Sequence, residues 1–311
     1  MVNSLVTGGA GFIGSHIVEK LLELGHEVRI FDDFSTGNKK NIELFKKDVE
    51  IVKGNIQIKD EVRNACKGMD YVFHEAAMTS VSESIKNPAR CWKINITGTQ
   101  HILNGSVKAN VKRVMLASSA AVYGDSMNLP KTEDMPIKAI SPYGNSKIMN
   151  EIEARKYFKE YDLETVSLRY FNVFGPRQDP LSPYSGVISK FIGMMMDRES
   201  PTVYGNGKQT RDFIYVKDVV EANILAMNEN KAPGLTFNIA MGKQTSILDI
   251  IEILNGIMKK KLTPHFEPAQ EGDIKHSYAD ITKAKELIGF EPKWELQKGL
   301  KETVKWFKVR K

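Results

Sequence analysis

The sequence predicts an α/β protein with a doubly wound parallel sheet and a smaller C-terminal lobe. In the first half, short β-rich runs alternate with helical stretches, and strands in this order pair in parallel through crossover helices. From about residue 175 the chain changes to loops rich in proline and glycine with shorter helices. We therefore expect a nucleotide-binding domain over residues 1–174 and a substrate lobe over residues 175–311, with the chain crossing back between them.

The elements of the first half follow one another regularly. Strands are expected at 2–8, 27–33, 49–55, 70–77 and 113–119, with helices between them at 12–25, 59–68 and 91–110. In the first helix, Ile13, Ile17, Leu21 and Leu24 keep helical spacing, and Gly25 ends it. This order predicts a Rossmann-like sheet. In the second half, the amphipathic patterns of SILDIIEILNGIMKK and ELQKGLKETVKWFK predict helices that pack on a core.

Composition excludes several classes of protein. The 311 residues, 41% of them hydrophobic, can bury a large core. The 44 basic residues exceed the 38 acidic ones but are scattered, which disfavours nucleic-acid binding and suits a small polyanion such as a nucleotide diphosphate. The two cysteines lack CxxC spacing, so neither a disulfide framework nor a metal site is expected. No apolar run approaches the roughly 20 residues of a membrane span, and no signal sequence is recognised, so we expect no membrane partner and a cytoplasmic protein.

A glycine-rich motif lies between the first predicted strand and helix. Residues 7–14 read TGGAGFIG, which gives GxGxxG spacing through Gly9, Gly11 and Gly14, and a second spacing through Gly8, Gly11 and Gly14. Glycines there let the backbone approach a pyrophosphate, whose charge the helix N-terminus stabilises. The motif alone is also compatible with a simple turn.

An acid after the second strand makes the nucleotide interpretation stronger. Asp32 ends EVRIFD, where a carboxylate accepts hydrogen bonds from an adenosine ribose and repels a 2′-phosphate. NAD is therefore preferred to NADP, although Lys39 and Lys40 keep NADP as an alternative. Asn55 and the pair Ala76–Ala77 follow the third and fourth strands, at the edge where such a ligand binds.

A tyrosine and a lysine define the candidate catalytic site. In SPYGNSK, Tyr143 and Lys147 are one helical turn apart. A phenol has a pKa of about 10, and an adjacent ammonium, helped by a cationic nicotinamide ring, favours the phenolate that removes a proton from a sugar hydroxyl. Ser119 ends the preceding strand and can hydrogen-bond the same hydroxyl; a strand cap is the alternative. Tyr204 and Lys208 repeat the spacing, but the glycines of YGNGK predict a turn.

Together, TGGAGFIG, SSAAVYGD and SPYGNSK resemble the extended short-chain dehydrogenase/reductase family, and within it the NAD-dependent nucleotide-sugar epimerases and dehydratases. The second half is also similar, in RYFNVFGPRQDP, VYGNGKQTRDFIYVKDVVEA and HSYADITKAKELIGFEP. The resemblance implies NAD as a tightly held cofactor. The residues implied to bind it are Gly8, Gly11, Phe12, Ile13, Gly14, Asp32, Asp33, Ser35, Thr36, Gly37, Asn55, Ile56, Ala76, Ala77, Asn95, Tyr143, Lys147 and Tyr170.

The resemblance also suggests the reaction. Dehydratases of this family place Asp-Glu after the serine or threonine, and decarboxylases tend to place an acid there, whereas this chain has Ala120–Ala121. Because neither alanine donates a proton, C4 epimerisation of UDP-hexoses is favoured. Tyr143 would take the O4 proton, Ser119 would steady O4, and Lys147 would hold the ribose. The 4-keto sugar would then turn and regain the hydride on its other face.

The substrate is expected to be a UDP-sugar. The positions implied to contact it are Thr79, Ser119, Asn172, Val187, Thr202, Tyr204, Gln209, Arg211, Asp273 and Ser277. Gln270 stands where the family usually has an arginine, which removes an expected phosphate contact. Ser277 replaces a bulky tyrosine of some relatives, so UDP-GlcNAc and UDP-GalNAc should enter as well as UDP-glucose and UDP-galactose. A UDP-uronic acid is an alternative, for which Thr79, Ser80 and Ser82 could supply hydroxyls.

Two other functions are compatible with the fold. One is a regulatory scaffold that binds NAD without catalysis, which typically loses the tyrosine or lysine retained here. The other is a one-way sugar reductase with dissociable NADPH. The helices around residues 91–109 and 144–161 match those that relatives pair across a two-fold axis, so we expect a homodimer.

Structural roles are expected for three of the four remaining polar residues, and the fourth has no explanation. His74 ends a strand and is expected to be a hydrogen-bonded core histidine. Arg169 and Asp212 are expected in internal ion pairs. Glu75 stands where an apolar residue is expected beside the nicotinamide, and the sequence offers no physical account of it.

Overall fold

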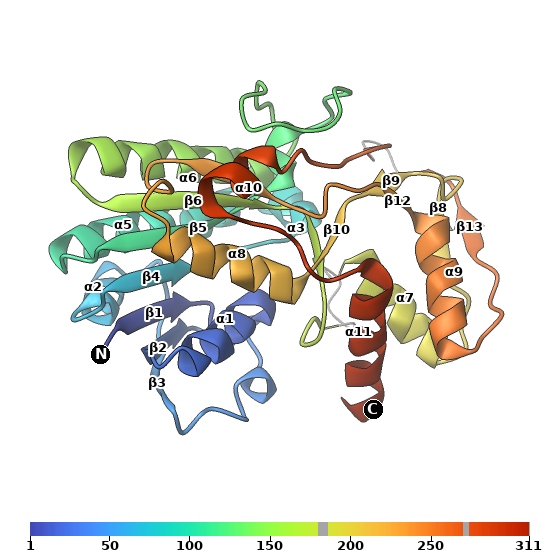
Figure 1. The fold of residues 1–311 in the computed structure, drawn as a ribbon, viewed down its shortest axis with the longest axis horizontal. Coiled ribbons are helices and arrows are strands. Elements are labelled where there is room, and N and C mark those ends of the chain that lie inside the picture. The colour runs from blue at the N-terminus through green and yellow to red at the C-terminus, as the bar shows by residue number, and fades with distance from the viewer. Residues whose placement is uncertain (180–185, 270–273, 311) are drawn as a thin grey trace.

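A seven-stranded parallel sheet forms the centre of the protein, as predicted (Figure 1). The computed structural model describes residues 1–179, 186–269 and 274–310. The strands are β1 (Asn3–Thr7), β2 (Glu27–Asp32), β3 (Val49–Lys53), β4 (Tyr71–His74), β5 (Arg113–Ser119), β6 (Glu164–Tyr170) and β11 (Thr236–Ile239). Their order, β11-β6-β5-β4-β1-β2-β3, reverses direction between β1 and β4. In such sheets, ligands bind outside the carboxyl ends of the strands at this reversal.

Helices cover both faces of the sheet, so its strands are apolar on both sides. On one face lie α1 (Phe12–Glu23), α8 (Val216–Asn228) and α10 (Thr282–Ile288); on the other lie α2 (Lys59–Cys66), α5 (Gly98–Lys108) and α6 (Pro142–Glu160). Neighbouring residues alternate between the two cores: Val6 and Ile30 pack on the side of α1, while Leu5 and Phe31 pack on the side of α2. This two-sided burial fixes the register of the strands and therefore where each one ends.

The smaller lobe lies beyond the carboxyl ends of the central strands, at the right of Figure 1. Its helices are α7 (Val187–Met196), α9 (Ile247–Met258) and α11 (Leu296–Arg310). Its short strands pair as β7 (Asn172–Phe174) with β10 (Phe213–Tyr215), β8 (Thr202–Tyr204) with β13 (His265–Glu267), and β9 (Thr210–Arg211) with β12 (Thr245–Ser246). Phe191, Tyr215, Leu254 and Leu300 share its separate apolar core.

The second half of the chain returns to the central sheet. β11 pairs in parallel with β6, and α8 packs against α1. The division at residue 174 stays a prediction. One helix differs from expectation: the segment predicted as a helix over 91–110 starts earlier, with α3 (Val81–Lys86) and α4 (Pro88–Trp92), and reaches α5 through a π-helical turn over Lys93–Thr97.

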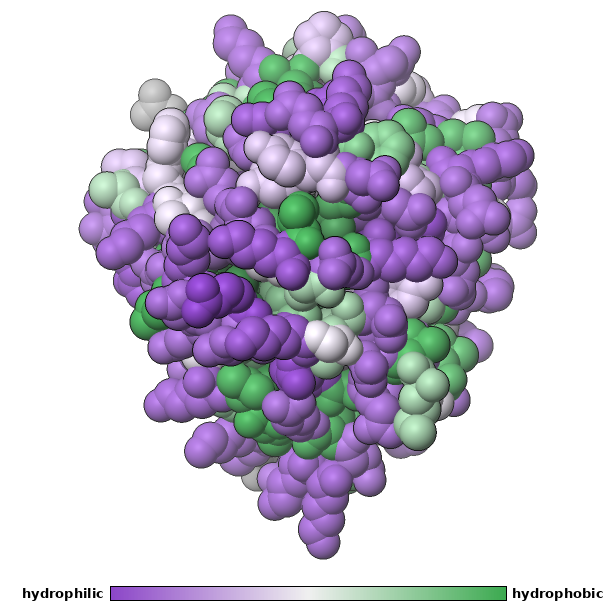
Figure 2. Space-filling view, turned by 90° about the vertical axis from the view of Figure 1, so that its left-hand side faces the viewer, coloured by the Kyte–Doolittle hydropathy of each residue, from purple (hydrophilic) through white to green (hydrophobic). Residues whose placement is uncertain are grey.

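The surface at the amino ends of the strands is mostly hydrophilic, and its hydrophobic residues lie in separate areas (Figure 2). Within residues 1–179, 186–269 and 274–310, no helix has both the length and the apolar character required to cross a membrane.

Candidate active site

The predicted site residues of the first half meet at the carboxyl ends of four neighbouring strands. Thr7 of β1 lies opposite His74 of β4, and Ser119 of β5 lies opposite Tyr170 of β6. The glycine loop follows β1 directly, and Ala76–Ala77 follow β4. The sheet therefore brings the predicted cofactor and catalytic residues to one edge.

The glycine loop is packed so closely that larger side chains do not fit. Gly8 has a φ of +68°, and a Cβ there would lie 2.8 Å from the backbone nitrogen of Ala76. A Cβ on Gly14 would lie 2.2 Å from the Gly8 carbonyl oxygen. Helix α1 begins after Gly11 without a side-chain cap and without an acid in its first turn. Its first amide groups are thus uncapped by side chains and suit the pyrophosphate of NAD.

Two acids follow β2. The Asp32 carboxylate is only 7% exposed and accepts hydrogen bonds from the backbone N–H groups of Ala10 and Phe34, at 2.9 and 2.8 Å. Burial raises its pKa. Asp33 is half-buried and accepts bonds from the Ser35 N–H and the Asn55 side-chain amide. Both carboxylates stand where a ribose 2′-phosphate would be repelled, which supports NAD over NADP. Their contacts to a ribose stay predictions.

Local interactions determine where α6, the helix that carries Tyr143, begins. Ser141 caps α6, because its hydroxyl accepts a bond from the Gly144 N–H at 3.1 Å, and Pro142 occupies the first helical position. The N–H of Tyr143 donates to the Ser84 hydroxyl at 3.1 Å. Ser84 is fully buried and belongs to α3, so α3 holds the turn that carries the predicted catalytic tyrosine.

The three predicted catalytic side chains lie together. The Ser119 hydroxyl lies close enough to the Tyr143 phenol to lower its pKa. The Nζ of Lys147 lies 5.8 Å from the centre of the Tyr143 ring and donates to the carbonyl of Ala117 at 2.7 Å. A serine, a tyrosine and a lysine in this arrangement can bind one hydroxyl and accept its proton.

In the polypeptide alone, burial raises the pKa of Tyr143, and the interaction with Ser119 offsets only part of this effect. The Lys147 ammonium donates to a backbone carbonyl, and burial lowers its own pKa to about 8. That this ammonium, together with a cationic nicotinamide ring, favours the phenolate stays a prediction.

Ser118 and Ser119, the last two residues of β5, have different surroundings. Ser118 is buried, and its hydroxyl donates to Glu151 Oε1 at 2.5 Å. The same carboxylate forms a buried ion pair with Arg169, at 2.7 Å. This pair confirms the internal ion pair expected for Arg169. Ser118 is thus a structural contact beneath the site, while Ser119 lies in it.

The candidate substrate residues gather in the smaller lobe. Asn172 donates through its side chain to the Asp212 carbonyl at 3.0 Å, and Gln209 donates to the Tyr204 carbonyl at 2.8 Å. Arg211 Nη1 donates to the carbonyl of Thr210 at 3.0 Å. The N–H of Ser277 donates to the same carbonyl at 3.1 Å.

Other candidate positions lie at the edges of this group. Val187 begins α7 and Thr202 begins β8. Ser80 caps α3 and its hydroxyl lies 3.2 Å from that of Ser82, whereas Thr79 is exposed. The predicted contact Asp273 and the substitution at Gln270 lie outside the described residues. All contacts of these positions to a substrate stay predictions.

Three structural interpretations can be compared with the structure. His74 is buried between the hydroxyls of Thr7 and Thr99, at 2.8 and 2.9 Å, and burial lowers its pKa to about 3, as expected for a neutral core histidine. The YGNGK segment is a turn, as predicted. The ion pair expected for Asp212 is wrong: across the described ranges its carboxylate accepts backbone N–H groups, including that of Met241 at 2.8 Å.

Two predicted cofactor residues have internal partners. The Asn95 side chain is buried; its amide group donates to the Met78 carbonyl and the Ser146 hydroxyl, and its oxygen accepts the Met78 N–H. Asn95 therefore holds the loop that follows β4. Ile56 is buried against Gly98. A Cβ on Gly98 would lie 2.6 Å from the Ile56 side chain.

Sequence reasoning missed the supporting residues Ser84 and Glu151. Glu151 follows Lys147 by four residues, so the helical spacing of Tyr143, Lys147 and Glu151 contained a signal. Nothing local distinguishes Ser84, since its partner is distant in sequence. In the described part of the chain, no cluster of acidic, histidine and cysteine side chains could hold a metal ion.

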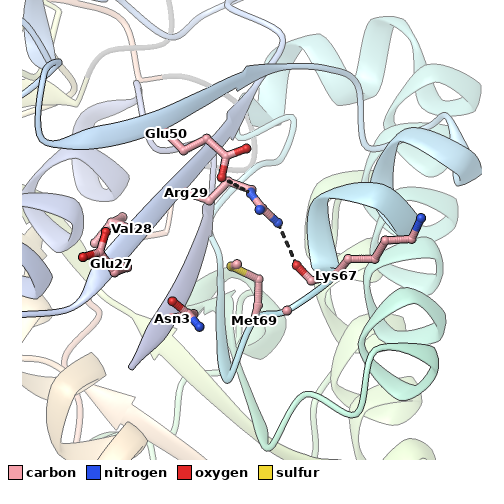
Figure 3. A pocket seen from close by; sticks show the side chains of 8 residues that line it. Asn3, Glu27, Val28, Arg29, Glu50, Lys67 and Met69 are labelled. Carbon is pink, nitrogen blue, oxygen red and sulfur yellow. Dashed lines mark hydrogen bonds and ion pairs between the residues drawn. The ribbon is translucent and has the colours of Figure 1, made fainter. Parts of the chain in front are cut away.

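A cavity of about 340 Å³ lies at the opposite, amino-terminal end of the sheet (Figure 3). The Arg29 guanidinium that lines it already bonds Glu50 at 2.7 Å and the Lys67 carbonyl at 2.9 Å. The cavity is far along the strands from Ser119 and Tyr143, so it takes no part in the site described above.

Comparison with known proteins identifies the family. The model of the NAD dependent epimerase/dehydratase family matches residues 4–240. A protein of Methanocaldococcus jannaschii named putative UDP-glucose 4-epimerase is 41% identical over 306 residues, covering 98% of each chain. The chain belongs to the NAD-dependent epimerase/dehydratase family.

Solved structures of two relatives are also similar. UDP-N-acetylglucosamine 4-epimerase from Methanobrevibacter ruminantium M1, in complex with UDP-N-acetylmuramic acid, is 39% identical with a TM-score of 0.95, covering 100% of this chain and 99% of the other. UDP-glucose 4-epimerase from Thermotoga maritima, with UDP-glucose, is 38% identical with a TM-score of 0.95, covering 99% of each. This protein is thus an enzyme related to UDP-sugar 4-epimerases, with NAD as its cofactor.

Proposed function

We propose that the enzyme epimerises UDP-hexoses at C4, interconverting UDP-glucose with UDP-galactose and UDP-GlcNAc with UDP-GalNAc. The observation that carries this proposal is the contact of Ser119, Tyr143 and Lys147 beside Ala120 and Ala121, which provide no second acid. A single proton acceptor suits removal and return of one hydroxyl proton, whereas dehydration needs a further acid to protonate a leaving group. The names of the relatives described above support this choice.

In this proposal, the polypeptide handles the O4 proton. Ser119 hydrogen-bonds the sugar O4, and Tyr143 removes its proton as C4 is oxidised. NAD, when bound, supplies the hydride acceptor and later the hydride donor at C4. The keto sugar then turns within the lobe, and Tyr143 returns its proton to O4 on the other face. Lys147 keeps positive charge beside the phenolate.

Substitution of Ser277 tests the size of the pocket at the sugar C2 group. Purified protein is incubated separately with UDP-Glc, UDP-Gal, UDP-GlcNAc and UDP-GalNAc, and each C4 epimer is followed by chromatography. Both pairs should interconvert. Ser277→Tyr should retain the glucose pair and lower kcat/KM for the N-acetyl pair at least ~5-fold, because steric exclusion of a bound group typically costs more than 1 kcal/mol.

The matched control is Ser106→Thr, a change of similar chemistry in α5 on the far side of the sheet. It should leave the ratio between the two sugar pairs unaltered. Loss of the glucose pair to the same extent as the N-acetyl pair in Ser277→Tyr would contradict the pocket argument, and inertness of all four sugars would contradict the proposed function.

We further propose a homodimer formed through α3, α4 and α6. These neighbouring helices expose large hydrophobic side chains, namely Ile85, Trp92, Met149 and Ile152. Apolar side chains gathered on adjacent helices are typical of a helix–helix interface between subunits. Light scattering should give twice the 35.0 kDa of the chain, and Ile152→Glu should reduce this mass to that of a monomer. A monomeric mass for the unaltered protein would refute the dimer.

A further inference from the structure

Glu75 is an acid placed within the predicted cofactor residues. It follows β4 directly, and its N–H donates to the Thr7 carbonyl at 3.2 Å. Its backbone packs against the glycine loop, since a Cβ on Gly8 would lie 3.1 Å from the Glu75 carbonyl carbon. Ala76–Ala77 come next. Glu75 therefore lies between the loop that would hold the pyrophosphate and the strand ends that carry the catalytic residues.

The side chain of Glu75 is fixed by a short chain of hydrogen bonds. The Tyr170 phenol donates to Glu75 Oε1 at 2.8 Å, and the Asn223 amide donates to the same phenol oxygen at 2.8 Å. Asn223 is fully buried and is held by the Val219 carbonyl at 2.9 Å. The phenol has one proton and donates it in the bond to Glu75, so the Glu75 carboxylate is the acceptor in this network.

Glu75 has one cationic neighbour, which lowers its pKa from a distance, but no ion-pair partner among the described residues. Lys147 of α6 is the neighbouring cation, but its ammonium donates to Ala117, and the structure has no ion pair between it and Glu75 in the described residues. Tyr143 of α6 and Tyr170 of β6 are neutral phenols whose pKa values Glu75 raises further. The adjacent His74 is a neutral imidazole. Burial raises the pKa of Glu75 to about 7.

We propose that the Glu75 carboxylate makes this enzyme bind the oxidised, positively charged form of NAD in preference to the neutral reduced form. The proposal rests on the NAD dependence of the family and concerns the cofactor alone. A partly buried carboxylate without a direct ion-pair partner is stabilised by a further positive charge nearby. The nicotinamide ring has that charge only when it is oxidised, so Glu75 distinguishes the two forms of an otherwise identical ligand.

The proposal predicts a pH dependence with a definite sign. A nearby opposite charge lowers a carboxyl pKa by about 1–3 units. Oxidised NAD should therefore bind more tightly as pH rises through 7 and Glu75 ionises, while reduced NAD should not. Each unit of pKa difference corresponds to about tenfold in affinity. The ratio of oxidised to reduced cofactor bound should thus rise at least about tenfold between pH 5.5 and pH 8.

The test equilibrates purified protein with equal concentrations of NAD⁺ and NADH at each pH until the bound ratio is constant. Unbound cofactor is removed by rapid desalting, and both bound forms are quantified by chromatography after separate acid and alkaline extraction. Glu75→Gln keeps an acceptor for Tyr170 and should give a low, pH-independent ratio. Tyr170→Phe removes a donor that lowers the Glu75 pKa, so it should move the midpoint to higher pH.

The matched control is Glu133→Gln. Glu133 is another carboxyl whose pKa is raised by burial, but its partner is the N–H of Asn238, at 2.7 Å. This variant should behave as the unaltered protein. A pH-independent ratio in the unaltered protein, or an unaltered rise in folded Glu75→Gln, would overturn the proposal; if that variant does not fold, an unmoved midpoint in Tyr170→Phe would do so. No sugar is present, so the result is independent of the epimerase assignment.

Discussion

Tyr143→Phe is expected to lower the epimerase kcat by about 10²–10⁴-fold, the range that a positioned acid–base group contributes. The substitution removes one oxygen, the atom that interacts with Ser119 and that, in the proposed mechanism, accepts the proton. The ring and its packing beside Lys147 are retained. The variant should therefore keep its fold and its bound NAD. The measurement is initial-rate epimerisation of UDP-glucose, with bound NAD quantified after denaturation.

The control is Tyr161→Phe, which makes the same change at the other end of α6. Tyr161 is exposed and stacks on Tyr157, with ring centres 4.8 Å apart. This variant should keep full activity. If Tyr143→Phe also kept activity within a few-fold, another group would have to accept the O4 proton and the proposed role of Tyr143 would be wrong.

The same tyrosine predicts the pH dependence of the unaltered enzyme. Burial raises the pKa of Tyr143, so the phenolate fraction grows as pH rises above neutrality. Lys147 has a pKa of about 8 and loses its charge above that pH. The rate should therefore increase from pH 6 to about pH 8 and gain little further, since the positive charge that favours the phenolate is then lost.

Local patterns in the sequence were sufficient for the sheet and the catalytic pair. Alternating strands and helices determine a parallel sheet, and helical spacing places Tyr143 and Lys147 on one face of a helix. The carboxyl ends of neighbouring strands then bring the glycine loop and Ser119 together. These predictions needed only short-range periodicity and one general rule of connection.

Features that depend on distant contacts could not be predicted. The bond between Ser84 and the Tyr143 N–H joins residues 59 positions apart, and the bond between Glu75 and Tyr170 joins residues 95 apart. The burial that raises the Tyr143 pKa also comes from distant contacts, which local sequence patterns do not give. Asp212 was misjudged for the same reason, since its backbone partners come from loops folded around it.

The buried ion pair beneath the site should have the largest effect on stability. Glu151→Gln leaves the Arg169 guanidinium buried without its carboxylate, and removal of one partner of a buried pair costs about 3–5 kcal/mol in the free energy of unfolding. The loss can be measured by urea denaturation followed by circular dichroism. Glu151 also accepts the Ser118 hydroxyl, so the change loosens the contact between α6 and the strand that ends in Ser119.

An exposed ion pair provides the comparison that separates burial from charge. Lys285 and Glu291 approach to 2.8 Å, as close as the buried pair, but both side chains are mostly exposed. Glu291→Gln makes the same chemical change and should leave the free energy of unfolding nearly unchanged, because water solvates the remaining ammonium. Equal losses in the two variants would contradict the argument, since the distance between the charges is similar and only the burial of the partner left behind differs.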